Sequence, residues 1–343
     1  LFLHCRDAPP MSWNLPPVAG ALTWCRGLLM GFRVISFASS SPNGSAFPRE
    51  RVRVHLSPTF NRTPHADAAL EASIDAAWRA RLSRHPQLFN ASKFRLSDLR
   101  IRAGDGEDGH DRVLELAWGV TDYKTYLGTC CSPHSSQFRS EAADGAAKFA
   151  SLSRKVGVAA VVLTSDARVA LIRRSHAVGV YPNMLDTPGG HPEPSHIGLS
   201  AETLAGLETD VDGEQKRAME DAAVREFFAS IVNEVHEEIN LPETDLTAPL
   251  LLGVVLQSDA CTPSFSYFLR TTRSADEVMA LYRAGPKDRF ESSTLELIDA
   301  AQLLGDDNAA FMEHLTPSAR GSLQLWKEYV GNQQLRAPTA AAM

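Results

Sequence analysis

The chain has 343 residues, which allows two domains, and its hydrophobic content of 44% is enough for a substantial core. The formal net charge of −7 argues against nucleic acid as a partner, because a phosphate backbone needs clustered Lys and Arg. The five cysteines are odd in number and show no metal-ligand spacing, which indicates free thiols in a reducing compartment.

The first 48 residues differ in composition from the rest of the chain. Residues 8 to 49 contain no acidic side chain, and Arg, Ser and Pro recur there, a composition typical of organelle transit peptides. The apolar stretch at 18–37 is interrupted by Arg26 and Arg33, so we predict no membrane span. We expect residues 1–48 to be a disordered or targeting extension, or a gene-model artefact, and the body of the protein to be cytoplasmic.

Residues 49–150 predict a small α+β domain. Alternating apolar and polar residues at 51–56 predict a strand. Apolar residues recur every four positions between residues 70 and 82, which predicts a helix that begins after Pro64. Further elements are expected as strands at 94–102 and 112–118, a turn at 103–109, a short helix at 121–127 and a polar loop at 134–145.

Residues 151–332 predict the larger domain, followed by a disordered tail at 333–343. Strands and helices alternate along it, which favours an α/β fold. The segment 194–212 is rich in Ser, Gly, Glu and Asp, and we expect an exposed loop there. The predicted strands are 156–163, 169–172, 249–257, 265–270 and 295–298, and the predicted helices are 215–239, 274–282 and 317–329.

The helix predicted at 215–239 carries three carboxylates on one face. Glu234, Glu237 and Glu238 are separated by three and four residues, so their side chains are neighbours on the helix surface. Such close like charges repel, and a divalent cation such as Mg²⁺ is a common reason to tolerate them, while a solvated acidic face is the alternative. The opposite, apolar face is marked by Val224, Phe227, Phe228, Ile231, Val235 and Ile239.

A glycine-rich turn precedes this helix, with the sequence Asp186-Thr187-Pro188-Gly189-Gly190-His191-Pro192-Glu193-Pro194. Two adjacent glycines allow the backbone to approach a ligand closely. The turn and the carboxylate helix together resemble the Nudix box, G-x5-E-x7-R-E-U-x-E-E-x-G-U with U aliphatic, the signature of hydrolases that cleave diphosphates linked to another group. The resemblance implies the Nudix α/β/α sandwich with a smaller N-terminal α+β domain.

The chain departs from this pattern at several positions. Between Gly190 and Asn233 lie 42 residues where the pattern has 13, and Asn233 stands in place of the Arg. His196 falls where the first Glu belongs, and Asn240 replaces a Gly that follows the helix in a left-handed conformation. These features resemble the uridine diphosphate glucose pyrophosphatase subfamily and its plant relatives. Matching segments outside the box are Leu88-Phe89-Asn90, Lys93-Phe94-Arg95-Leu96, Gly119-Val120-Thr121-Asp122-Tyr123-Lys124, Leu127-Gly128-Thr129, Arg173-Arg174-Ser175 and Phe290-Glu291-Ser292.

The resemblance implies a Mg²⁺-dependent enzyme that hydrolyses UDP-glucose, and also UDP-galactose, to UMP and the sugar 1-phosphate. It implies Glu234 and Glu238 as metal ligands, with Glu237 as a third ligand or as the residue that orients the attacking water. Ser318 matches a family position near the ligand and is grouped with the metal residues. Because it follows Pro317 at a helix start, an N-terminal cap is the alternative for Ser318.

The substrate-binding residues implied by the resemblance lie in both domains. Phe89 and Tyr123 match pocket positions at which a uracil base stacks on an aromatic ring, so the N-terminal domain would form a lid, with core aromatics as the alternative. The remaining residues have roles that their chemistry suits: Arg174 for a phosphate, Asp186 for sugar hydroxyls, His191 for a phosphate or sugar oxygen, and Glu193 for metal or substrate unless it is solvent-exposed.

Two other functions remain open at this point. The same chemistry could act on another nucleoside diphosphate, such as ADP-ribose, if the pocket lacked the matched aromatics. A non-catalytic nucleotide-binding module is suggested by the missing Arg and first Glu of the box, and is opposed by the three retained carboxylates. No partner other than a small-molecule nucleotide sugar is expected, and the sequence does not give the oligomeric state.

Overall fold

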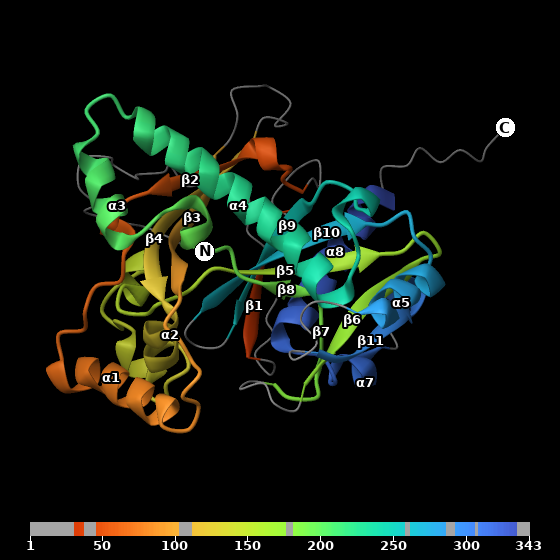
Figure 1. The fold of residues 1–343 in the computed structure, drawn as a ribbon, viewed down its shortest axis with the longest axis horizontal. Helices are drawn as coiled ribbons and strands as arrows, with labels where there is room; N and C mark the ends of the chain where they lie inside the picture. The colour runs from red at the N-terminus through yellow and green to blue at the C-terminus, as the bar shows by residue number, and fades with distance from the viewer. Residues whose placement is uncertain are drawn as a thin grey trace.

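The computed structural model describes residues 31–37, 46–102, 112–175, 181–257, 261–285, 292–305 and 308–334. The turn expected at 103–109 and nearly all of the tail expected at 333–343 lie outside these ranges. Within them the chain forms a large mixed sheet, a small sheet and helices that cover both (Figure 1).

The N-terminal part forms the small sheet, in the strand order β2-β4-β3. β2 and β4 are parallel, whereas β3 and β4 are antiparallel. The Asp67 carboxylate caps the first helix by accepting from the amides of Ala69 and Leu70. The elements are β2 (Val52–Leu56), α1 (Ala68–Leu82), β3 (Ser92–Arg102), β4 (Val113–Asp122) and α2 (Tyr123–Thr129), with 3₁₀ turns at Arg49–Arg51, Pro58–Phe60, Ser135–Phe138 and Gly145–Phe149.

The large sheet has the order β1-β9-β10-β5-β6-β11, with the two-residue strands β7 and β8 paired to β6 and β5. Only β10 and β5 are parallel among its described pairs. Its strands are β1 (Phe32–Ser36), β5 (Gly157–Leu163), β6 (Arg168–Arg174), β7 (Leu185–Asp186), β8 (Gly189–Gly190), β9 (Leu250–Gln257), β10 (Thr262–Arg270) and β11 (Ser292–Asp299).

Helices α4 and α8 cover opposite faces of the large sheet. Alternate residues of β6 show this directly, because Ala170 and Ile172 pack in the cluster with α4, whereas Val169 and Leu171 pack in the cluster with α8. The sheet is therefore the middle layer of an α/β/α sandwich. The helices are α3 (Ala201–Gly206), α4 (Glu214–Ile239), α5 (Ala275–Ala284), α6 (Ala300–Leu304), α7 (Ala309–Met312) and α8 (Pro317–Gln334), with 3₁₀ turns at Pro194–Ile197, Leu207–Thr209 and Glu243–Asp245.

Helix α4 runs diagonally across both sheets and joins them into one core (Figure 1). The ring of Phe227 lies edge-on to Trp118 of the small sheet and to Phe265 of the large sheet, each at a centroid distance of 5.0 Å. The six apolar residues expected on one face of this helix are all buried. The structure thus confirms the predicted helix and its buried stripe.

Two segments differ from the sequence-based expectation. Residues 32–36 lie within the expected extension, yet they form β1, which pairs antiparallel with β9 at the edge of the large sheet. The segment 194–212 is not simply an exposed loop, because it forms two 3₁₀ turns and α3 and buries Leu199, Leu204 and Leu207. Asn240 ends α4 with φ of 58° and ψ of 30°, the left-handed conformation expected there. Among the described residues, no helix has both the length and the apolar character needed to cross a membrane.

Candidate active site

Three carboxylates of α4 accept hydrogen bonds from alternate backbone amides of the glycine-rich turn. The amide of Gly189 donates to Oε2 of Glu238 at 2.8 Å, and that of His191 donates to Oε1 of Glu234 at 3.3 Å. The amide of Glu193 donates to Oε1 of Glu226 at 2.9 Å. In an extended segment, amides two residues apart point the same way, so the turn presents a row of donors to the helix. We call this arrangement the amide row.

The amide row requires a glycine at the point of closest approach. A Cβ atom on Gly190 would lie 1.8 Å from Oε1 of Glu234, a distance that no real side chain allows. The neighbouring Gly189 is equally confined, because a Cβ there would lie 2.3 Å from the carbonyl oxygen of Val158. The two glycines therefore allow the turn to lie against both the β5 strand and the carboxylates of α4.

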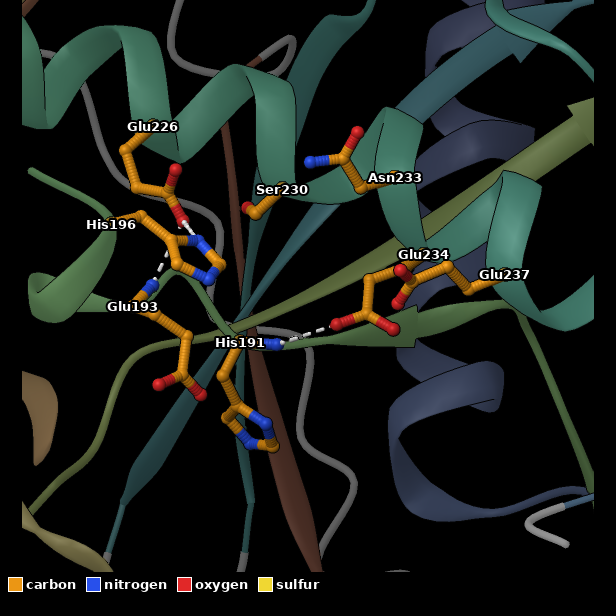
Figure 2. Close-up of a pocket in the computed structure, with 8 residues that line it drawn as sticks. All are labelled: His191, Glu193, His196, Glu226, Ser230, Asn233, Glu234 and Glu237. Atoms are coloured by element: carbon orange, nitrogen blue, oxygen red, sulfur yellow. Dashed lines mark hydrogen bonds and ion pairs between the residues drawn. The ribbon is translucent and has the colours of Figure 1, made fainter. Parts of the chain in front are cut away.

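A pocket of about 220 Å³ opens beside the amide row. One wall comes from α4 and the other from the glycine-rich turn and the segment after it (Figure 2). Glu234 and Glu237 both line the pocket. Glu238 does not, and it is buried with only 4% of its surface exposed. The lining residues are His191, Glu193, His196, Glu226, Ser230, Asn233, Glu234 and Glu237.

Glu226 is a pocket residue that the sequence analysis missed. It is 8% exposed, and its Oε1 accepts from the Glu193 amide and lies 3.0 Å from Nδ1 of His196 (Figure 2). One side chain thus ties the turn and the start of the inserted segment to α4. Its position two helical turns before Glu234 is the signal that could have revealed it, since that spacing places both on one face.

Arg174 and Asp186 form an ion pair at 3.2 Å, between the ends of β6 and β7. The Asp186 carboxylate also accepts from the Thr316 hydroxyl at 2.7 Å and from the Thr187 amide at 3.0 Å. Burial raises the pKa of Asp186, while Arg174 and these hydrogen bonds lower it in part. The structure therefore brings together two of the predicted substrate residues as a hydrogen-bonded pair.

His191 and Glu193 each contact a lysine for which the sequence predicted no role. The Nζ of Lys155 lies against Nε2 of His191, and the Nζ of Lys93 pairs with the Glu193 carboxylate. Burial, with the nearby positive charges of Lys155 and Lys93, holds the pKa of His191 well below its usual value. The imidazole is therefore neutral. Glu193 is not a solvent-exposed loop residue, because it is half-buried and pairs with Lys93 on β3 of the small sheet.

The remaining predicted site residues lie outside this pocket. Phe89 is 76% exposed, so the alternative that it belongs to the core is wrong. Tyr123 is half-buried at the start of α2, with its ring edge-on to Trp78 at 6.3 Å. Ser318 lies 3.0 Å from the Ser264 hydroxyl, and the helix is capped instead by Thr316, whose hydroxyl accepts from the Ala319 amide.

Comparison with known proteins assigns the family. The chain is 31% identical over 300 residues to uridine diphosphate glucose pyrophosphatase NUDT22 of Bos taurus, covering 87% of this chain and 98% of that one. It is also 31% identical to Nudix hydrolase 9 of Arabidopsis thaliana, over 77% of this chain and 82% of that one. The chain belongs to the Nudix hydrolases.

No family model matches this Nudix hydrolase. Among solved structures, a MutT protein from Methanosarcina mazei Go1 covers 52% of this chain and 94% of its own, with 14% identity and a TM-score of 0.32. That structural likeness is too weak to carry an argument. The assignment rests on the sequence relatives, and the sandwich described above agrees with it.

In the Nudix box of this chain, the negative charge of the carboxylates is stabilised without the box arginine. Asn233 occupies that position and is exposed on the pocket wall. The amide row supplies hydrogen-bond donors to Glu226, Glu234 and Glu238 instead. Hydrogen bonds from backbone amides favour the ionised form of a carboxylate, so these donors offset part of the mutual repulsion.

Nudix hydrolases generally use divalent metal ions, and the donor set here fits such an ion. Within the described residues, no three His, Cys, Asp or Glu side chains are grouped so that they alone hold a metal. Mg²⁺ keeps several waters and is commonly bound by one or two carboxylates together with substrate phosphates. Glu234 and Glu237 supply such carboxylates to the pocket, so its oxygen-rich wall suits a hard cation bound with its substrate.

Proposed function

We propose that this Nudix hydrolase is a Mg²⁺-dependent diphosphatase that hydrolyses UDP-glucose and UDP-galactose to UMP and the sugar 1-phosphate. The observation that carries the proposal is the amide row, which fixes three carboxylates beside a pocket whose other wall holds His191 and Glu193. The printed names of the mammalian relatives support the choice of a uridine diphosphate sugar.

In this proposal Glu234 and Glu238 are the principal metal ligands. Glu238 accepts from the Gly189 amide through Oε2, and a carboxylate has enough lone pairs to accept such a bond and also coordinate a cation. Glu237 lines the pocket and either adds a ligand or orients the attacking water. When bound, Mg²⁺ neutralises the phosphate charge and lowers the pKa of its water. Ser318 is proposed to complete this set near the start of α8.

The substrate is proposed to bind between the two sheets. Arg174 donates two hydrogen bonds to a phosphate, and Asp186 accepts from sugar hydroxyls. His191 and Glu193 position the diphosphate. The exposed ring of Phe89 and the ring of Tyr123, both in the N-terminal part, are proposed to hold the uracil. This part would then act as a lid over the substrate.

The test of this proposal is a product assay on a panel of substrates. UDP-glucose, UDP-galactose, UDP alone and ADP-ribose are incubated with Mg²⁺ or with EDTA, and the nucleotide products are separated. We expect UMP from the two UDP-sugars with Mg²⁺ and none with EDTA. Turnover of ADP-ribose alone would contradict the substrate assignment. No turnover, with UDP-glucose still raising the melting temperature, would show a binding module instead.

A cytoplasmic location is part of the same proposal. The described cysteines, Cys130, Cys131 and Cys261, are thiols, which supports a reducing compartment. Fractionation of cells that express the full chain would test this, and recovery with an organelle would contradict it.

A further inference from the structure

We propose that Lys155 is a positioning residue of the substrate site. Its ammonium donates to Nε2 of His191 and so holds the imidazole with its proton on Nδ1, from which it donates to an anionic phosphate oxygen. The inference rests on the proposed function only in assigning a diphosphate to the pocket. The contact between Lys155 and His191 stands on the structure itself.

The geometry places the ammonium of Lys155 between the imidazole of His191 and the ring of Tyr126. The residue is 8% exposed, and its Nζ lies 4.3 Å from the centroid of the Tyr126 ring. An ammonium over an aromatic face is held by the negative potential of that face. His191 is the residue that Lys155 contacts on the pocket wall, and its backbone amide belongs to the amide row. The side chain of His191 is thus fixed at Nε2 and its main chain at Glu234.

Chemistry decides which ring nitrogen carries the proton. A neutral imidazole has one N–H and one acceptor nitrogen, whereas an ammonium has three donors and no acceptor. When Lys155 is charged, Nε2 must therefore be the acceptor, and the single proton must lie on Nδ1. The second nitrogen of His191 then becomes a donor, which is what a negatively charged phosphate oxygen requires.

Substrate binding strengthens this arrangement. Burial lowers the pKa of Lys155 to about 7, so the isolated site holds the ammonium weakly at neutral pH. A diphosphate nearby favours the charged form again, because an opposite charge raises the pKa of a lysine. Binding of the anion and selection of the Nδ1–H form of His191 are thus coupled. Uridine is neutral and does not raise the pKa of Lys155. The diphosphate is therefore the part of the substrate that is coupled to His191.

The first arm of the test observes the proton directly and needs no ligand. Histidine ¹⁵N spectra are recorded at about pH 6, below the lysine pKa of about 7, and His191 is assigned by loss of its signals in His191→Asn. We expect Nδ1–H in the wild type and loss of this preference in Lys155→Met. An unchanged tautomer in Lys155→Met would overturn the proposal even if the enzyme hydrolyses UDP-glucose normally.

The second arm measures binding of UDP and of uridine in EDTA by calorimetry. Lys155→Met should weaken UDP binding about tenfold, the equivalent of one charge-assisted hydrogen bond, and leave uridine binding unchanged. Lys155→Arg keeps a positive charge and should retain most of the UDP affinity. The control Lys148→Met removes a lysine that pairs with Glu141 on the surface, and it should change neither affinity.

The second arm distinguishes a wrong role for Lys155 from a wrong proposed function. Equal weakening of UDP and uridine binding in Lys155→Met would show a general structural role and overturn the positioning role. Wild-type protein that binds UDP neither in EDTA nor with Mg²⁺ would remove the diphosphate from the pocket and overturn the assigned acceptor. A wild type that binds UDP but hydrolyses nothing would contradict the proposed function and leave the role of Lys155 standing.

Discussion

Glu238 is held in the candidate site by a contact with a distant part of the chain. Its side chain is 4% exposed, and one of its oxygens accepts from the Gly189 amide. The spacing of Glu234 and Glu238 on a helix could be predicted from sequence, because it depends only on helical periodicity. The burial of Glu238 could not, because it depends on a turn almost fifty residues earlier. For the same reason, the contact between Lys155 and His191 left no trace in the sequence pattern.

An exposed aromatic ring is the residue-scale test of the proposed uracil site. Phe89 is 76% exposed, so Phe89→Ala should leave the melting temperature unchanged and raise KM for UDP-glucose about tenfold, since base stacking contributes about 1–3 kcal/mol. Steady-state kinetics and thermal melting measure both quantities. Val211, an apolar residue that is 97% exposed, provides the control, because Val211→Ala should change neither. An unchanged KM in Phe89→Ala would remove Phe89 from the site.

The buried ammonium of Lys155 predicts a pH-dependent stability. Its pKa is about 7 in the folded chain and 10.5 in the unfolded chain, so between these values the unfolded chain binds more protons and stability rises with pH. Below pH 7 the folded chain must hold a buried charge at full cost. Lys155→Met should therefore be stabilised relative to wild type below pH 7, by a few kcal/mol at about 1.4 per pKa unit, with the gain lost by about pH 10.

Urea denaturation of both proteins at several pH values measures this difference. Lys148→Met serves as the control, because its surface lysine carries no buried charge and should give a constant difference. A gain in stability that does not change between pH 6 and pH 10 would contradict the assigned burial of the charge.

At the scale of elements, the strongly periodic segments could be predicted and the irregular ones could not. Helix α4 begins one residue before the predicted start and ends at the predicted Ile239, because its apolar stripe and the following Asn240 define it. β1 was missed because its five residues belong to an acid-free stretch with recurring Arg, Ser and Pro, whose composition is typical of a targeting segment. β7 and β8 have two residues each, too few for any periodic pattern. The insertion was misread because its three buried leucines are diluted by polar residues.

Glu226 links that insertion to the box helix, so its removal tests the element-scale account. Glu226→Ala should lower the free energy of unfolding by about 1–3 kcal/mol, because the amide of Glu193 loses its acceptor. It should also raise KM, since the turn that carries His191 and Glu193 is released. Glu226→Gln keeps an oxygen acceptor and should cost less. Urea denaturation and kinetics of both variants measure this, and equal stability of Glu226→Ala and wild type would refute the link.

At the scale of the whole molecule, α4 makes one hydrophobic cluster out of two sheets. The cluster contains Trp118 and Leu116 of the small sheet together with Val158 and Phe265 of the large sheet. Arg154 adds a polar link, donating to the carbonyl oxygens of Ser97 and Cys261 on the two sides. The α/β/α sandwich was predicted correctly from the family resemblance, but this shared core was not. The division into two domains at residue 150 stays a prediction.

The shared core predicts a single unfolding transition. Trp118 reports on the small sheet and Trp326 on α8 at the far face of the large sheet, and both are at most 2% exposed. The difference in fluorescence between the wild type and a variant in which one of the two is replaced by Phe gives the signal of that tryptophan, because the other tryptophans of the chain are present in both. We expect coincident denaturant midpoints at both probes. Midpoints that differ by more than the error, with the small sheet unfolding first, would show independent domains.

In the proposed function, the amide row holds carboxylates for a metal-dependent hydrolysis. The most direct test is the rate of UMP release from UDP-glucose as Mg²⁺ is varied, in Glu238→Gln and in Glu220→Gln. Both residues lie on α4 and accept from a backbone amide, that of Gly189 and that of Leu56, so glutamine keeps the hydrogen bond in each. We predict that Glu238→Gln loses about a hundredfold or more in rate while Glu220→Gln is unchanged. Equal rates in the two variants would contradict the claim.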